Sequence, residues 1–201
     1  MQIEIRSKTE AVICGYVNAV GRDSREMRTV TGERFVEQIE PGTFQRALEK
    51  AGDVELRANH QRVLGSREAG SLELYEDAVG LYARALISDP DVIEKAERDE
   101  LRGWSFGFRA KKDIWEETGK DVKRRIVQDM ELREVSILDI TPAYIATTVE
   151  MRGEDEGYLE TRFLDDTCKV TRKEKTEKKE EERSEDALEA YERELEILKA
   201  I

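Results

Sequence analysis

Three residues that together could perform acyl transfer occur in a fixed order along the chain. The single histidine, His60, lies in the segment RANHQR (57–62), Ser105 follows in GWSFGF (103–108), and Glu134 in REVSIL (133–138). Histidine can take and return a proton near neutral pH. A serine hydroxyl becomes a nucleophile beside such a base, which a carboxylate can orient. The order His, Ser, acid therefore indicates a serine hydrolase site.

Each of these residues also has a purely structural explanation. His60 could be an ordinary histidine at the end of a strand, and Ser105 a buried serine at the start of one. An ion pair with Arg133 or Arg125 would account for Glu134 without catalysis. The functional interpretation rests on all three occurring together.

Two further residues compete for roles in this site. Glu131 is the alternative third member; it lies three residues before Glu134 and so on the opposite face of a regular strand, which lets only one of the two point at His60. We favour Glu134. Cys14 is the rival nucleophile, but a cysteine in an apolar strand is usually an inert part of the core.

Strand patterns dominate the chain up to about residue 150. The β-branched run 10–20 contains Gly15, which indicates a bulge or a close backbone approach. The run 54–57 alternates and leads directly to His60, and the runs 71–75 and 80–87 predict a hairpin.

Two helices are expected among these strands. The first begins with Thr43 as its N-cap and stops at Gly52. The second has Pro90 at its first helical position and ends at Gly103. Ser105 should therefore occupy the first residues of a strand.

Composition excludes several classes of protein. The formal net charge of -12 argues against nucleic acid or an anionic membrane as the main partner. No apolar stretch approaches the roughly 20 residues that span a bilayer, and the N-terminus lacks the pattern of a signal peptide. Cys14 and Cys168 have no CxxC spacing, and one histidine cannot complete a zinc site with them. We expect no metal or cofactor, and a reducing, cytoplasmic environment.

The chain changes character after residue 152. We expect a domain over 1–152, a charged linker over 153–183 that is either a solvated helix or disordered, and an amphipathic helix over 184–201. The helix carries a coiled-coil-type seam formed by Leu188, Tyr191, Leu195 and Leu198. Because about two heptads are too short to be stable alone, the helix either packs on its own domain or binds a partner.

Four short segments of the first 150 residues resemble the prohead maturation proteases of tailed bacteriophages, the caudoviral prohead protease family. This family is related in fold and mechanism to the herpesvirus assemblins. The resemblance covers roughly residues 3–148. It rests on NHQ (59–61), WSFGF (104–108), EVSI (134–137) and TPAY (141–144).

The resemblance implies a mainly β fold with flanking helices (α+β): a compact assemblin-like β-barrel, here followed by a charged C-terminal helical tail. It makes Ser105 the nucleophile and His60 the general base. Glu134 takes the place at which assemblins have a second histidine. Backbone donors of an oxyanion hole would fall near residues 139–141.

The expected function is that of a phage prohead serine endopeptidase with no cofactor, acting inside the procapsid in the bacterial host. Its substrates would be the scaffold protein or the scaffold-like segment of the major capsid protein, and then the protease itself. Those two proteins are the expected partners, and the protease could also self-associate; neither nucleic acid nor membrane is expected. The alternative is a catalytically degenerate, protease-like domain that serves as a structural scaffold or assembly protein.

Overall fold

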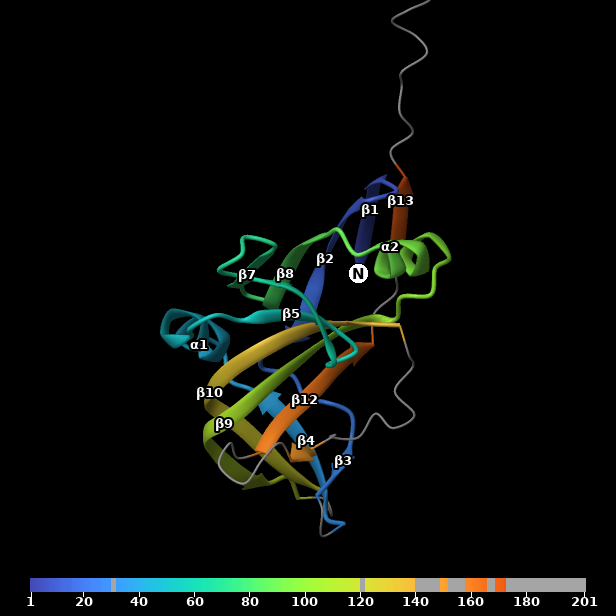
Figure 1. Ribbon diagram of the computed structural model, residues 1–201. Coiled ribbons are helices and arrows are strands. Elements are labelled where there is room, and N and C mark those ends of the chain that lie inside the picture. The colour runs from blue at the N-terminus through green and yellow to red at the C-terminus, as the bar shows by residue number, and fades with distance from the viewer. Residues whose placement is uncertain (30–31, 120–121, 140–148, 152–157, 166–168, 173–201) are drawn as a thin grey trace, which may run out of the picture.

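The computed structural model describes residues 1–29, 32–119, 122–139, 149–151, 158–165 and 169–172 (Figure 1). The elements, in chain order, are β1 (Gln2–Ser7), β2 (Glu10–Ala19), β3 (Met27–Arg28), β4 (Arg34–Ile39), α1 (Thr43–Lys50), β5 (Glu55–Ala58), β6 (Arg62–Ser66), β7 (Leu72–Glu76), β8 (Gly80–Ile87), α2 (Pro90–Glu97), β9 (Gly103–Glu117), β10 (Lys123–Leu138), β11 (Val149–Met151), β12 (Tyr158–Asp165) and β13 (Lys169–Arg172). The expected class, mainly β with helices at the sides, is confirmed.

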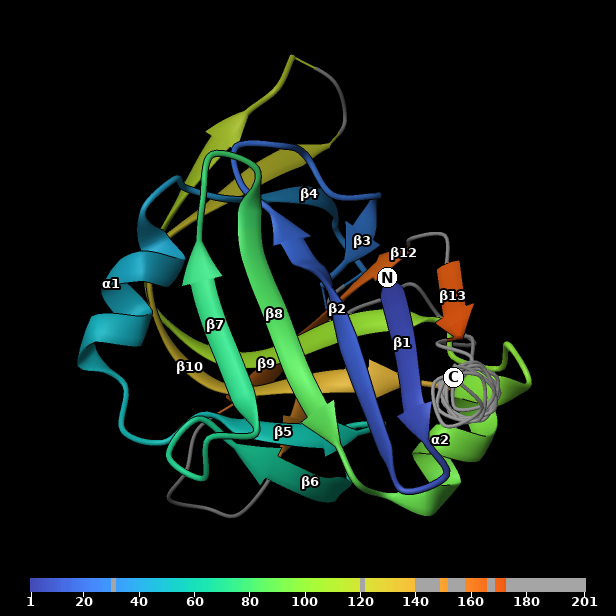
Figure 2. The ribbon, with the colours of Figure 1, turned by 90° about the horizontal axis from the view of Figure 1, so that it is seen from above.

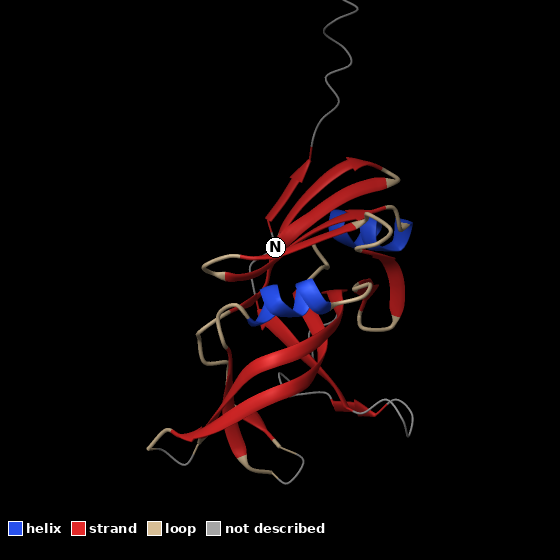
Figure 3. Cartoon of the chain, turned by 90° about the vertical axis from the view of Figure 1, so that its left-hand side faces the viewer, coloured by secondary structure: helices blue, strands red, loops and turns tan. Residues whose placement is uncertain are grey.

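The described strands form two sheets. A five-stranded sheet has the order β13-β1-β2-β8-β7, and an eight-stranded sheet has the order β11-β12-β9-β10-β4-β3, with β5 paired to β10 and β6 to β5. Figure 2 shows the first sheet as one layer, crossed behind by β9 and β10. Figure 3 shows both described helices on the outside of the strands. The β7–β8 hairpin expected from the sequence is present.

The closed barrel expected from the family resemblance is not found among the described strands. The cause lies in β10, which divides its pairing along its length: residues 123–127 run parallel to β4, and residues 134–137 run parallel to β5. Its other edge pairs with β9 throughout. The eight-stranded sheet therefore forks, and its pairing order leaves β11, β3 and β6 at open ends.

The core lies between the two sheets and under α1. Trp104, Phe106 and Phe108 of β9 are all buried, and Phe44 of α1 packs edge-on against Phe106 with ring centroids 5.3 Å apart. Burial of each aromatic ring contributes about 1.5–3 kcal/mol. Trp104 also lies against Gly15, where an added Cβ would be 3.2 Å from the indole Nε1. The added Cβ would also be 3.2 Å from the backbone Cα of Met1, which confirms the close backbone approach expected at that glycine.

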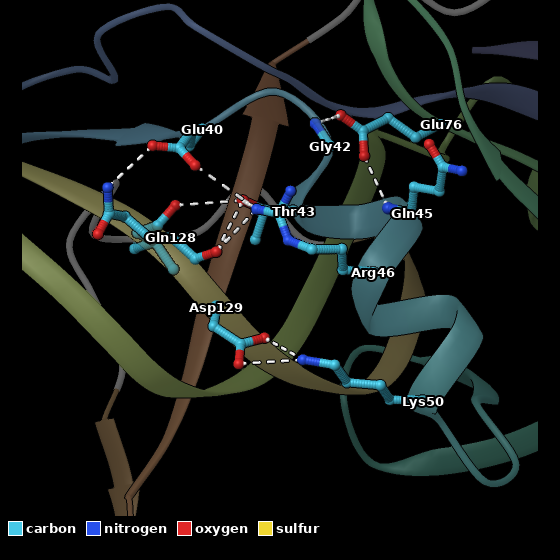
Figure 4. Close-up of polar contacts among 10 residues, drawn as sticks. Glu40, Gly42, Thr43, Gln45, Arg46, Lys50, Glu76, Gln128 and Asp129 are labelled. Atoms are coloured by element: carbon cyan, nitrogen blue, oxygen red, sulfur yellow. Dashed lines mark hydrogen bonds and ion pairs between the residues drawn. The ribbon is translucent and has the colours of Figure 1, made fainter.

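The start of α1 differs from the expectation, because the N-cap is Gly42 and Thr43 is already helical. The Thr43 hydroxyl is buried and donates instead to the Gln128 carbonyl oxygen (3.3 Å). The backbone N–H groups of Gly42 and Gln45, at the start of the helix, donate to the Glu76 carboxylate at 2.6 and 2.7 Å (Figure 4). A distant side chain thus performs the capping that a local residue usually supplies.

The second helix begins as expected and ends earlier. The Asp89 carboxylate accepts from the Val92 N–H at 3.1 Å, and Pro90 is the first helical residue. The helix ends at Glu97, and Asp99 then adopts a left-handed conformation (φ 57°). Gly103 is the first residue of β9 rather than the helix stop.

Strands continue beyond residue 152. β12 pairs with β9 and β13 pairs in parallel with β1, so ordered pairing reaches Arg172, inside the stretch that composition assigned to a linker. The helix expected over 184–201 lies outside the described residues.

Candidate active site

His60 lies in a tight turn directly after β5. Both Asn59 (φ 51°) and His60 (φ 62°) are left-handed, a conformation that costs a residue with a side chain roughly 1–2 kcal/mol. Bonds from β10 hold the turn: the Asn59 N–H donates to the Ile137 carbonyl at 3.0 Å, and the His60 N–H donates to the Ser136 hydroxyl at 3.2 Å. The histidine is therefore presented by a strained backbone that a neighbouring strand stabilises.

The imidazole of His60 contacts Glu134. Nδ1 lies 2.5 Å from Oε1 of the carboxylate. Because a carboxylate can only accept, this contact places a proton on Nδ1 and leaves Nε2 as the acceptor. Glu134 is 2% exposed, whereas the His60 side chain retains 20% of its surface. The pair thus consists of a buried acid and a partly accessible base.

Ser105 lies on the adjacent strand, as the third residue of β9. It pairs directly with Ser136 of β10, and such cross-strand neighbours have Cβ atoms about 4.5–5.5 Å apart on one face. Glu134 is two residues from Ser136 and shares that face. Ser105 is 1% exposed. Its burial also agrees with the alternative explanation, in which it is only a structural serine at the start of a strand. The structure brings His60 and Glu134 into contact and puts Ser105 on the same side of the sheet.

The second candidate acid, Glu131, is bound elsewhere. Its carboxylate contacts Lys111 and Arg133, each at 3.0 Å. The Lys111 ammonium, supported by Arg133, lowers the pKa of Glu131 despite partial burial. Glu131 therefore belongs to an ion-pair cluster on the β9–β10 ribbon.

The separation of the two acids does not come from strand parity, which was the basis of the expectation. A register shift after Leu132 pairs Glu134 with Gly107, while Glu131 pairs with Arg109. Since Gly107 and Arg109 are two residues apart, the bulge puts both acids on one face. Their different positions along β10 keep them apart.

Arg125, considered from the sequence as a partner of the acids, lies in another cluster. Its guanidinium binds Glu37 of β4 (3.1 Å), Asp113 of β9 (2.5 Å) and Glu160 of β12 (2.9 Å). This cluster joins four strands of the eight-stranded sheet. Arg125 is therefore a structural residue.

Sequence reasoning missed a polar group that braces the turn. Asn59 binds Asp139 twice: its Nδ2 donates to Oδ1 (2.6 Å), and the Asp139 N–H donates to the Asn59 Oδ1 (3.1 Å). Lys95 of α2 reaches the other carboxylate oxygen at 2.6 Å. Burial raises the pKa of Asp139, but the bonds from Lys95 and Asn59 outweigh it and the net shift is downward. The only signal in the sequence was the adjacency of Asn59 to His60.

A sequence model of one family, Caudovirus prohead serine protease, matches residues 1–159. The chain belongs to this family. The match covers β1 to β10 and therefore includes every residue of the candidate site, and it assigns the chain to phage capsid maturation. No curated protein and no solved structure matches the chain.

The rival nucleophile of this prohead protease lies in the other sheet. Cys14 lies on β2 in the five-stranded sheet, opposite Arg84 of β8. Burial raises the pKa of its thiol, which disfavours the reactive thiolate.

Two further observations on the prohead protease concern metal binding and membrane crossing. No group of His, Cys, Asp and Glu side chains suited to a metal ion occurs among the described residues. Within the same residues, no helix is long and apolar enough to cross a membrane.

The stretch expected to supply oxyanion donors is described only at its start. The Asp139 N–H is already bound to Asn59, so it is not available to a substrate oxygen. Residues 140–141 lie outside the described part of the prohead protease.

Proposed function

We propose that this prohead protease is an endopeptidase in which Ser105, His60 and Glu134 form the catalytic triad. The observation that carries the proposal is the 2.5 Å contact between His60 Nδ1 and Glu134 Oε1, made by a carboxylate that is almost fully buried. A buried acid bonded to the chain's only histidine is the arrangement that fixes one imidazole tautomer.

The proposed chemistry is acyl transfer through the serine. His60 Nε2 removes the proton of the Ser105 hydroxyl as its oxygen attacks the scissile carbonyl carbon. The imidazolium, stabilised by Glu134, then gives that proton to the departing amine, which breaks the peptide bond and leaves an acyl-enzyme. Water, activated by the same histidine, attacks the acyl carbon and releases the carboxylic acid and the free serine.

The proposed substrates are the scaffold protein or the scaffold-like segment of the major capsid protein, followed by the protease itself. Membership of a capsid-maturation family supports substrates of this kind. We further propose that residues 184–201 bind scaffold or capsid protein through the seam of Leu188, Tyr191, Leu195 and Leu198. The site of action would be the interior of the procapsid.

The decisive experiment compares Ser105→Ala with Cys14→Ser. Each purified variant is incubated with the phage's scaffold and major capsid proteins, and fragments are followed by mass spectrometry. Ser105→Ala is expected to abolish processing while keeping its melting temperature, because a hydroxyl-to-hydrogen change at a strand start removes little packing. Cys14→Ser should cleave normally.

Undiminished cleavage by Ser105→Ala would refute the serine assignment. A wild-type protein that assembles with capsid protein and never cleaves it would instead favour the structural, degenerate alternative.

A further inference from the structure

The hydroxyl of Ser136 stands between the two members of the His60–Glu134 pair. It donates to Glu134 Oε2 at 2.9 Å and accepts from the backbone N–H of His60 at 3.2 Å. The residue is fully buried. A serine hydroxyl has one proton to donate, and here it is committed to the glutamate.

On the histidine side, Ser136 extends the strand pairing around the turn. The parallel ladder between β5 and β10 ends where Ala58 pairs with Ile137. The next donor, the Asn59 N–H, still finds a backbone acceptor at Ile137. The following donor, the His60 N–H, has turned away from the ladder and is met by the Ser136 side chain. This bond helps to hold His60 in its left-handed conformation.

On the acid side, Ser136 restrains the glutamate. The terminal torsion of a Glu side chain is broad, so the contact to His60 alone would leave the carboxylate free to rotate. The Arg57 guanidinium also lies near Oε2, but its Nε is 3.7 Å away, which is too long for a hydrogen bond. His60 Nδ1 binds Oε1 and Ser136 binds Oε2, which fixes the plane of the carboxylate. The same restraint aligns the oxygen that faces the imidazole.

We propose that Ser136 is a positioning residue that couples the His60 turn to Glu134 and so sets the orientation of the general base. The proposal rests on the catalytic roles proposed above for His60 and Glu134. Ser136 itself touches no substrate in this scheme, because its proton is directed at Glu134.

The test uses Ser136→Ala, which removes both bonds, and Ser136→Thr, which restores the hydroxyl. Ser66→Ala is the matched control, since Ser66 is also buried and its hydroxyl accepts from the Ala69 N–H at 3.1 Å, outside the site. Steady-state cleavage of the major capsid protein gives kcat and KM. Ser136→Ala is expected to lower kcat by about tenfold to a hundredfold with KM unchanged, the range for one hydrogen bond to a charged group. Ser136→Thr should recover most of the rate.

A second readout does not depend on cleavage. Because His60 is the only histidine in the sequence, a protein made without a histidine tag gives one set of imidazole NMR signals. The low-field proton of an Nδ1–H bonded to a carboxylate is expected in the wild type, and should be lost or broadened in Ser136→Ala and retained in Ser66→Ala. If Ser136→Ala does not fold, Ser136→Cys, whose thiol is somewhat larger and a weaker donor than the hydroxyl, is measured in its place.

A wild-type kcat together with an unchanged His60 signal in Ser136→Ala would overturn the proposal. So would a loss of kcat matched by Ser66→Ala, because that loss would reflect stability alone. The proposed function fails separately, through continued cleavage by Ser105→Ala, and the His60 signal then still decides whether Ser136 orients the pair.

Discussion

Gly107 faces Glu134 across the β9–β10 ladder, and the space that a side chain at Gly107 would fill is occupied by the carboxylate. A Cβ built on Gly107 would lie 2.7 Å from Glu134 Oε1 and 2.8 Å from its Cγ. Both distances are too short for real contacts. The glycine two residues after Ser105 therefore provides the room in which Glu134 reaches His60.

Gly107→Ala is expected to displace Glu134 and to abolish or strongly reduce capsid-protein cleavage. Inserting a methyl group into a packed site typically costs about 1–3 kcal/mol, so the melting temperature should fall modestly. Gly52→Ala is the control, because nothing lies within 4 Å of the Cβ it would add. Normal cleavage by Gly107→Ala would mean that Glu134 can reach His60 from another position.

Glu134→Gln is expected to reduce kcat by a factor on the order of 10⁴, the loss typical when an amide no longer fixes the histidine tautomer. Glu131→Gln should retain nearly full activity, because the ion pairs it weakens, with Arg109, Lys111 and Arg133, lie outside the His60–Glu134 pair. Cleavage rates of the two variants under identical conditions provide the comparison. The opposite ranking would exchange the roles of the two acids.

The ion pair between Lys95 and Asp139 should make stability depend on pH in a defined direction. Asp139 has a lowered pKa in the folded protein. Its contribution to the free energy of unfolding is therefore complete above pH 3.8, the ordinary pKa, and is lost as the pH falls through the lowered pKa. Bonds to Asp139 and Asp91 raise the pKa of Lys95, so its contribution persists until the solution is strongly basic. Lys95→Met should therefore melt below wild type at neutral pH, and the difference should shrink under acid conditions. A difference independent of pH would show that packing of the lysine stem is responsible.

Arg125→Met is expected to destabilise the fold by about 3–5 kcal/mol, because it removes the guanidinium that binds the buried carboxylate of Glu37. Arg133→Met on the same strand removes an exposed ion pair with Glu131, which is worth about 0–1 kcal/mol. Urea unfolding of both variants gives the comparison. Equal losses would contradict the structural role assigned to the Arg125 cluster.

Removal of residues 173–201 is expected to leave the melting temperature unchanged, since it keeps every described strand, the last of which, β13, ends at Arg172. Incorporation into assembling procapsids, measured by co-sedimentation, should decrease because the proposed binding seam is lost. A large fall in melting temperature with normal incorporation would show that the tail packs on its own domain. Truncation before Lys169 would also remove β13, so a change in melting temperature would not report on residues 173–201 alone.

Sequence reasoning succeeded where local pattern and chemistry agree. The hairpin of residues 71–87, the position of Pro90 in its helix and the place of Ser105 at a strand start all follow from short-range signals. The meeting of His60 with Glu134 was also expected from their chemistry.

The predictions that were wrong concern positions where a residue distant in the sequence, or a β-bulge, determines the local structure. Thr43 is not the N-cap, and the N–H groups at the helix start are bound by Glu76, more than thirty positions away. The parity argument for Glu131 failed because a bulge after Leu132 leaves no mark in the pattern of residue types. No pattern in the sequence marks Ser136, because its bond to the His60 N–H depends on a turn that only the fold brings near.

The parallel pairing of Glu134–Ile137 with residues 55–58 also has a consequence for timing. The two strands are separated by nearly eighty residues of chain, and loops of that length must close before such a pairing gains any stability. Synthesis and folding must therefore proceed through the end of β10 before the histidine and the glutamate can meet. A nascent or half-folded chain therefore holds no assembled His60–Glu134 pair, and the proposed catalytic site can form only after β10 has paired with β5.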